Sequence, residues 1–147
     1  MIGQAPGPKT SPNYPLFPFP PTSAGGKLHK LTGLSLEDYF KKYERTNLLR
    51  DFPGATPGGG DRWPLQEARA AARALVPSLK GRRVLFIGRN VSRAFMYGGG
   101  FEYFHLYYQE EDDFTFAIVP HTSGVSRFYN DPVNVASAQK FLSSIQK

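Results

Sequence analysis

The sequence predicts an α/β fold, in which a three-layer α/β/α sandwich surrounds a central, mostly parallel sheet of four strands. Short apolar runs alternate with stretches of helical spacing, and that alternation is typical of parallel sheets with helical crossovers. The runs at 83–88 and 114–119 are continuously apolar, as expected for strands covered on both faces. A chain of 147 residues suits one domain, spanning 1–147.

The first half of the chain supplies two strands and two helices. Met1 and Ile2 form the end of a first strand, and residues 43–49 form a second. Between them Ser35 is a helix N-cap followed by acidic residues, which predicts a short helix over 35–41. A longer helix is expected over 63–79, since helical spacing relates Ala68, Ala71, Ala72, Leu75 and Leu79.

The second half continues the alternation. The strand at 83–88 precedes an expected helix at 91–96, and the strand at 114–119 follows. Asp131 and Pro132 are an N-cap and a first-turn proline, so they begin a C-terminal helix. Its expected apolar side consists of Val133, Ala136, Phe141, Leu142 and Ile145.

The composition restricts the possible chemistry. A net charge of +6 and a pI near 9.7 favour a polyanionic partner. The absence of Cys excludes thiolate zinc sites, iron–sulfur ligation and cysteine nucleophiles, and we expect no metal and no cofactor. Because no apolar run approaches the roughly 20 residues of a membrane span and no signal peptide is evident, we expect a cytoplasmic monomer without membrane contact.

Two segments at opposite ends of the chain resemble the two active-site motifs of the uracil-DNA glycosylase superfamily. Each follows an apolar strand, where open α/β sheets place their ligands. The first motif, which frames a base pocket, is matched by Gly3, Gln4, Ala5, Pro6 and Gly7. The second, usually His-Pro-Ser, is matched by residues 121–123, with Thr122 in place of Pro.

Ala5 stands where several branches of the superfamily carry an Asp or Asn that activates water. The first motif is therefore most similar to branches with Gly-Glu-Ala-Pro-Gly, whose thermophilic members hold an iron–sulfur cluster with four Cys. This chain has no Cys, so the resemblance implies a cluster-free relative or a separate branch.

The resemblance also implies roles for individual residues. His121 would donate a hydrogen bond to the pyrimidine oxygen that gains charge as the glycosidic bond breaks. Asn47, in a Thr-Asn-Leu segment like that of the relatives, would read the edge of the extruded base. DNA contacts are expected from Ser123, Gly124, Ser126 and Arg127.

A Pro-rich stretch at 7–26 contains three aromatic residues, Tyr14, Phe17 and Phe19, and reads as an ordered loop. Either Phe17 or Phe19 would stack on the extruded base. Residues 16–18 match the corresponding loop of the superfamily best, which favours Phe17 as the base-binding residue without excluding Phe19.

The expected function is that of a monofunctional DNA glycosylase, which flips out uracil or a modified pyrimidine and leaves an abasic site. No lyase activity is expected, since no Lys is placed for a Schiff base. The alternative is a degenerate member that binds modified or single-stranded DNA without cleavage, because Ala5 and Thr122 depart from the motifs. A nucleotide-binding domain is not favoured, since residues 88–93 lack the Gly pattern and Lys of a P-loop.

Overall fold

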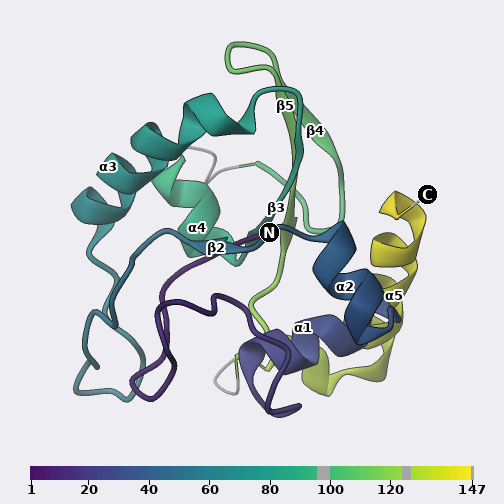
Figure 1. Ribbon diagram of the computed structural model, residues 1–147, viewed down its shortest axis with the longest axis horizontal. Helices are drawn as coiled ribbons and strands as arrows, with labels where there is room; N and C mark the ends of the chain where they lie inside the picture. Colours follow the sequence, from purple (N-terminus) through teal and green to yellow (C-terminus); the bar gives the residue numbers. More distant parts are fainter. Residues whose placement is uncertain (96–99, 124–126, 147) are drawn as a thin grey trace.

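The computed structural model describes residues 1–95, 100–123 and 127–146 and shows an α/β fold around a five-stranded sheet (Figure 1). The strand order is β2-β1-β3-β5-β4. The strands are β1 (Ile2–Gly3), β2 (Thr46–Asn47), β3 (Arg83–Ile87), β4 (Tyr107–Gln109) and β5 (Phe114–Val119). All neighbours are parallel except β4, which pairs antiparallel with β5. The prediction of four strands is therefore wrong, because β4 adds a short edge strand whose three residues were too few to recognise by periodicity.

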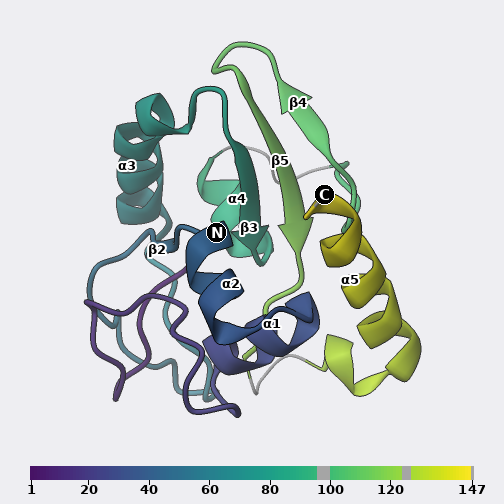
Figure 2. The same cartoon turned by 45° about the vertical axis from the view of Figure 1, so that its right-hand side comes forward.

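Helices lie on both faces of this sheet. They are α1 (Ala24–Thr32), α2 (Leu36–Lys42), α3 (Leu65–Leu75), α4 (Arg89–Ala94) and α5 (Pro132–Ile145), with 3₁₀ turns at Val76–Leu79 and Phe128–Asn130. Helices α3 and α4 cover one face, and α1, α2 and α5 cover the other (Figures 1 and 2).

The buried residues of β3 alternate between two cores. Val84 and Phe86 belong to the cluster that includes the buried residues of α3 and α4. Leu85 and Ile87 belong to the cluster formed with α1, α2 and α5. Both faces of the central strand are therefore buried, as its continuous apolar run predicted.

Two helix starts are confirmed by their caps. The Ser35 hydroxyl accepts a hydrogen bond from the Asp38 amide at 3.1 Å, and Asp131 Oδ1 accepts one from the Val133 amide at 2.9 Å. The apolar side expected for α5 is partly wrong, since Val133 is 70% exposed and Ala136 is also exposed. Leu142 is buried as expected, and Phe141 and Ile145 pack against the same core, which also includes the buried Ala138, because tertiary packing selects a slightly rotated stripe.

Three other boundaries differ from those predicted. The strand at 43–49 shrinks to Thr46–Asn47, because Tyr43 still caps α2. The helix at 63–79 is α3 followed by a 3₁₀ turn that contains Pro77. The helix at 91–96 begins earlier, at Arg89, and Met96 lies outside the described residues.

Helix α1 lies partly inside the segment expected to be a loop. Ser23 caps it by accepting a hydrogen bond from the Gly26 amide at 3.0 Å. A Cβ on Gly25 would lie 2.2 Å from the Phe17 carbonyl oxygen, and one on Gly26 would lie 2.3 Å from that of Pro20. The glycine pair, which disfavours a helix in sequence, is thus required because the helix start contacts the Pro-rich loop directly.

No helix in the described part of the chain combines the length and the apolar character needed to cross a membrane.

Candidate functional site

The candidate site is a cavity of about 120 Å³ at the carboxyl ends of β1, β2 and β5. It unites both motifs, the Asn47 segment and the Pro-rich loop, which are far apart in sequence. Its lining residues are Gln4, Ala5, Pro6, Gly7, Thr10, Leu16, Phe17, Phe19, Pro20, Ser23, Ala24, Gly25, Asn47 and His121. None of these side chains carries a full charge when His121 is neutral, so the cavity suits a neutral ligand.

His121 lies two residues beyond the end of β5, and its imidazole has a defined orientation. The Ser123 amide donates a hydrogen bond to His121 Nδ1 at 3.0 Å. Because Nδ1 accepts, the proton of the neutral ring lies on Nε2, which makes Nε2 a donor. Burial lowers the pKa of His121, and the charge of Asp61 acts in the opposite direction more weakly. The side chain is therefore a neutral hydrogen-bond donor at physiological pH.

Thr122 has a structural role that explains its departure from the usual Pro. Its buried hydroxyl donates a hydrogen bond to the Ala24 carbonyl oxygen at 2.7 Å. Ala24 is in the first turn of α1 and also lines the cavity. The His121 motif is thereby joined to the helix that forms the opposite wall.

The first motif and the Asn47 segment are held together by their backbones. The Leu48 amide donates to the Gly3 carbonyl oxygen and the Leu49 amide to that of Gln4, both at 2.9 Å. A Cβ on Gly3 would lie 2.5 Å from Asn47 Oδ1, so Gly3 leaves room for the carboxamide. No residue in the described part of the chain forms a hydrogen bond with the Asn47 side chain, whose donor and acceptor remain available at the cavity.

The remaining residues of the first motif form the floor of the cavity. Gln4 Oε1 accepts a hydrogen bond from Asn90 Nδ2 at 3.4 Å, which fixes its amide. Gly88 lies against both Gln4 and the His121 ring, and its φ of 98° favours glycine at this position. Ala5 presents only a methyl group, so this position supplies no proton acceptor.

Phe17 and Phe19 both line the cavity, so either ring is placed to contact a ligand there. Phe17 is half-buried, with its ring 5.4 Å from Tyr14 and 5.9 Å from Phe40. Phe19 is more exposed and contacts Phe17 edge-on at 6.0 Å.

A groove of about 390 Å³ shares the His121 loop. Thr122 and Ser123 line it, as do two lysines of α1, Lys27 and Lys30, and no Asp or Glu side chain is among its lining residues. Arg127 is exposed just before the 3₁₀ turn at Phe128–Asn130. Gly124 and Ser126, which the sequence assigned to DNA contact, lie outside the described residues.

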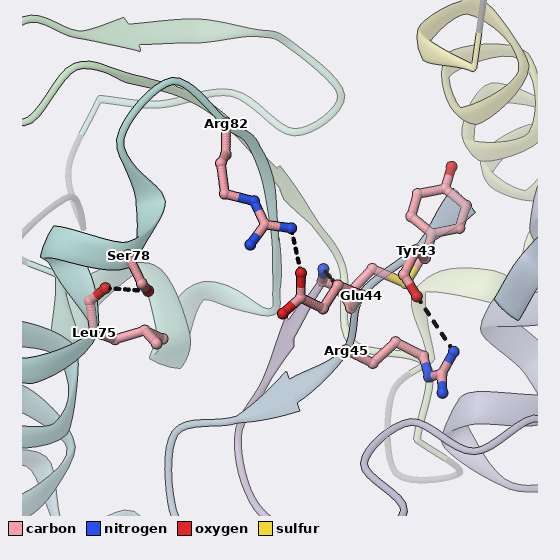
Figure 3. Close-up of polar contacts among 7 residues, drawn as sticks. Tyr43, Glu44, Arg45, Leu75, Ser78 and Arg82 are labelled. Carbon is pink, nitrogen blue, oxygen red and sulfur yellow. Dashed lines mark hydrogen bonds and ion pairs between the residues drawn. The ribbon is translucent and has the colours of Figure 1, made fainter. Parts of the chain in front are cut away.

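A second cavity, of about 180 Å³, lies at the amino ends of β1, β2 and β3. Arg82 Nη2 pairs with Glu44 Oε2 at 2.5 Å, and Arg45 donates to the Tyr43 carbonyl oxygen at 3.3 Å (Figure 3). Ser78 donates to the Leu75 carbonyl oxygen at 2.7 Å. Each of these side chains already binds another side chain or a backbone carbonyl oxygen. This cavity therefore offers a ligand fewer free polar groups than the candidate site does.

Sequence reasoning missed the wall contributed by α1, namely Ser23, Ala24 and Gly25. The signal was Ser23, an N-cap residue placed before Leu28 and Leu31 at helical spacing. The adjacent glycine pair concealed it. Thr10, Leu16 and Pro20 also line the cavity without having been singled out.

In chemical terms the cavity combines a neutral imidazole donor, a free carboxamide and aromatic walls. These groups suit a planar ring that bears carbonyl and amide groups along its edge. Within the described residues no cluster of His, Asp and Glu is placed to hold a metal ion. Comparison with protein-family models and with curated protein sequences finds no match to this chain.

Proposed function

We propose that this protein is a monofunctional DNA glycosylase of the uracil-DNA glycosylase superfamily, which extrudes uracil or a modified pyrimidine and hydrolyses its N-glycosidic bond. The observation that carries the proposal is the convergence of His121, Asn47 and Phe17 on one uncharged cavity. The cavity is built from four segments that are distant in sequence. From its sequence, each segment was assigned a different part in the same reaction.

The cavity would hold the extruded base by three kinds of contact. The Asn47 carboxamide pairs with the edge of the base through one donor and one acceptor. An aromatic ring of the Pro-rich loop replaces the stacking that the base loses on leaving the DNA. The backbone of residues 4–7 lines the cavity and would lie beside the ring, while Gly3 leaves room for the Asn47 carboxamide.

Bond cleavage requires stabilisation of the departing base. As the bond from C1′ to the base nitrogen breaks, its electron pair moves to the base and the sugar becomes an oxocarbenium ion. His121 Nε2–H donates to the base carbonyl oxygen that gains this charge, and the bond strengthens in the transition state. Water then adds to C1′ and its proton passes to the departing base anion, which leaves an abasic site and a neutral free base.

The strand carrying the base would pass along the groove beside the His121 loop. Lys27, Lys30 and the exposed Arg127 offer positive charge there, and Ser123 offers a hydroxyl. Phosphate contacts of this kind orient the DNA without reading its sequence. We further propose a three-layer α/β/α sandwich, acting as a monomer in the cytoplasm; helices on both sheet faces support the layering.

The test is base release without added metal or nucleotide. DNAs containing uracil or modified pyrimidines, including phage DNA, are incubated with the protein, and free bases are identified by mass spectrometry. We expect release of at least one pyrimidine and alkali-labile abasic sites in the same DNA. Intact DNA across the whole panel would contradict the enzymatic proposal.

A second candidate is a binding module that holds an extruded base without cleaving it. Ala5 favours this alternative, because no carboxylate lines the cavity to accept a proton from water. Tight binding of a modified DNA together with an absence of base release would identify this activity.

A further inference from the structure

An aromatic platform, defined here as Tyr14, Phe17, Phe19 and Phe40, extends from the cavity through ring contacts with Phe17. Tyr14 is 57% exposed, Phe19 is 51% exposed and Phe40 is 42% exposed. Large rings seldom remain this exposed in a contiguous group unless the group binds something. The platform is therefore a candidate binding surface in its own right.

Phe17 connects the platform to the cavity. Its ring centroid lies 5.4 Å from Tyr14, 6.0 Å from Phe19 and 5.9 Å from Phe40. Phe17 and Phe19 line the cavity, whereas Tyr14 and Phe40 are not among its lining residues. A ligand that extends out of the cavity would meet these outer rings next.

The platform is held in place by the surrounding fold. Tyr39 donates from its hydroxyl to the Leu16 carbonyl oxygen at 3.2 Å, and Arg45 Nε donates to that of Pro15 at 3.4 Å. The Arg45 guanidinium also lies 4.8 Å from the Phe40 ring centre, which adds a positive charge at the platform edge. These contacts hold the loop at Pro15 and Leu16, and the Phe40 ring, in place before a ligand binds.

We propose that the aromatic platform stacks unpaired nucleobases next to the extruded one, so that single-stranded DNA is the preferred substrate. This inference rests on the proposed function and specifies its substrate. Stacking requires π-faces, which these rings supply and which bases inside a duplex do not expose. The net charge of +6 favours a nucleic acid over an apolar peptide as the occupant.

The test compares binding of one labelled strand with and without its complement. The probe is a fluorescein-labelled oligothymidylate of about 12 nucleotides, within the range of single-strand site sizes, and its duplex with oligoadenylate. Fluorescence anisotropy gives both affinities for the wild type, Tyr14→Leu and Tyr14→Leu/Phe40→Leu. Leucine keeps the apolar contact but removes the π-face, and Tyr14 contributes little to the core because it is exposed.

Tyr108→Leu is the matched control, because Tyr108 is 62% exposed on β4 and outside the platform. We expect each platform substitution to weaken single-strand binding by about tenfold, with duplex binding and the control unchanged. The platform proposal would be overturned if the platform variants lost affinity equally for the strand and the duplex, or kept wild-type affinity for the strand. It would also be overturned if the wild type did not bind the strand.

Two further outcomes separate this proposal from its alternatives. If the wild type is a dimer that these substitutions dissociate while strand affinity is retained, the rings form an interface between copies and the proposal is wrong. If strand binding depends on the platform but no base is released from any DNA, the platform stands and the glycosylase proposal fails.

Discussion

The cavity at the carboxyl ends of the strands and the cavity at their amino ends differ in what their polar side chains contact. At the amino ends, Glu44, Arg82, Arg45 and Ser78 bind protein atoms (Figure 3). At the carboxyl ends, the Asn47 carboxamide has no hydrogen-bond partner among the described residues, and His121 uses only Nδ1 in the contacts found there.

This difference shows how one sheet separates stability from binding. Polar groups that satisfy one another hold segments in place, whereas groups left open at a cavity retain hydrogen-bonding capacity for a ligand. The cavity at the amino ends is the larger of these two, so their polar groups, and not their volumes, distinguish the candidate site.

The largest effect is expected from removing the imidazole. His121→Ala should slow single-turnover base release by about a hundredfold, since a donor to developing charge contributes roughly 3 kcal/mol. DNA affinity should change little, because the contact strengthens only as the bond breaks. An unaltered rate constant would remove His121 from the mechanism, and a parallel loss of affinity would make it a docking residue instead.

The next effect concerns discrimination between bases. Asn47→Ala should reduce base release by about tenfold, corresponding to ~1.4 kcal/mol for a lost hydrogen bond. The ratio of rates between cleavable pyrimidines should also narrow, while general DNA affinity remains. Competition between two modified DNAs measures this ratio, and an identical ratio for variant and wild type would refute the assignment.

The pH dependence tests the protonation state of His121. Burial lowers its pKa, so base release should be constant at neutral pH and decline only well below the ordinary value of about 6.5. In the unfolded chain His121 gains a proton near pH 6.5, whereas in the folded chain it does so only at lower pH. The free energy of unfolding should therefore also fall as the pH drops below about 6.5.

Replacing Asp61 changes the pKa of His121 without changing the imidazole itself. Its charge raises the His121 pKa slightly against the effect of burial, so Asp61→Asn should lower that pKa further. The acidic decline in rate should then move to lower pH without a change in the neutral-pH rate. A shift to higher pH would show that the electrostatic assignment is wrong.

The smallest effect is expected at the amino ends of the strands. Glu44→Gln removes an exposed ion pair with Arg82, so the free energy of unfolding should fall by less than about 1 kcal/mol. Base release should equal that of the wild type. Chemical denaturation and single-turnover kinetics on the same preparation check both expectations, and a large loss of base release would contradict the contrast between the two ends.

The centre of the sheet was predictable because β3 and β5 are continuous apolar runs. Residues 83–88 and 114–119 carry a clear signal, whereas β4 is a three-residue edge strand that periodicity does not reveal. Ser35 and Asp131 gave correct helix starts, since capping is local chemistry. On α5 the expected Leu142 is buried, but Val133 and Ala136 are exposed, because the exact stripe depends on contact with α1, which local spacing does not encode.

The site was predictable where a motif follows a strand and unpredictable where a wall comes from tertiary contact. Gln4, Ala5, Phe17, Asn47 and His121 all line the cavity that their motifs suggested. The wall formed by Ala24 and Gly25 depends on a helix pressed against the Pro-rich loop. The role of Thr122 likewise emerges only once its hydroxyl is seen to bind the Ala24 carbonyl oxygen.

If the cavity at the carboxyl ends receives the base, filling that cavity should prevent base release. Ala5→Leu enlarges a side chain that lines that cavity, while Glu44→Gln alters only the opposite end. Both variants and the wild type are compared in single-turnover base release, with DNA affinity and thermal unfolding as controls. We expect Ala5→Leu to bind DNA and unfold like the wild type but to release almost no base, and we expect Glu44→Gln to release base at the wild-type rate. Base release by a folded Ala5→Leu at the wild-type rate would contradict the proposal that this cavity receives the base.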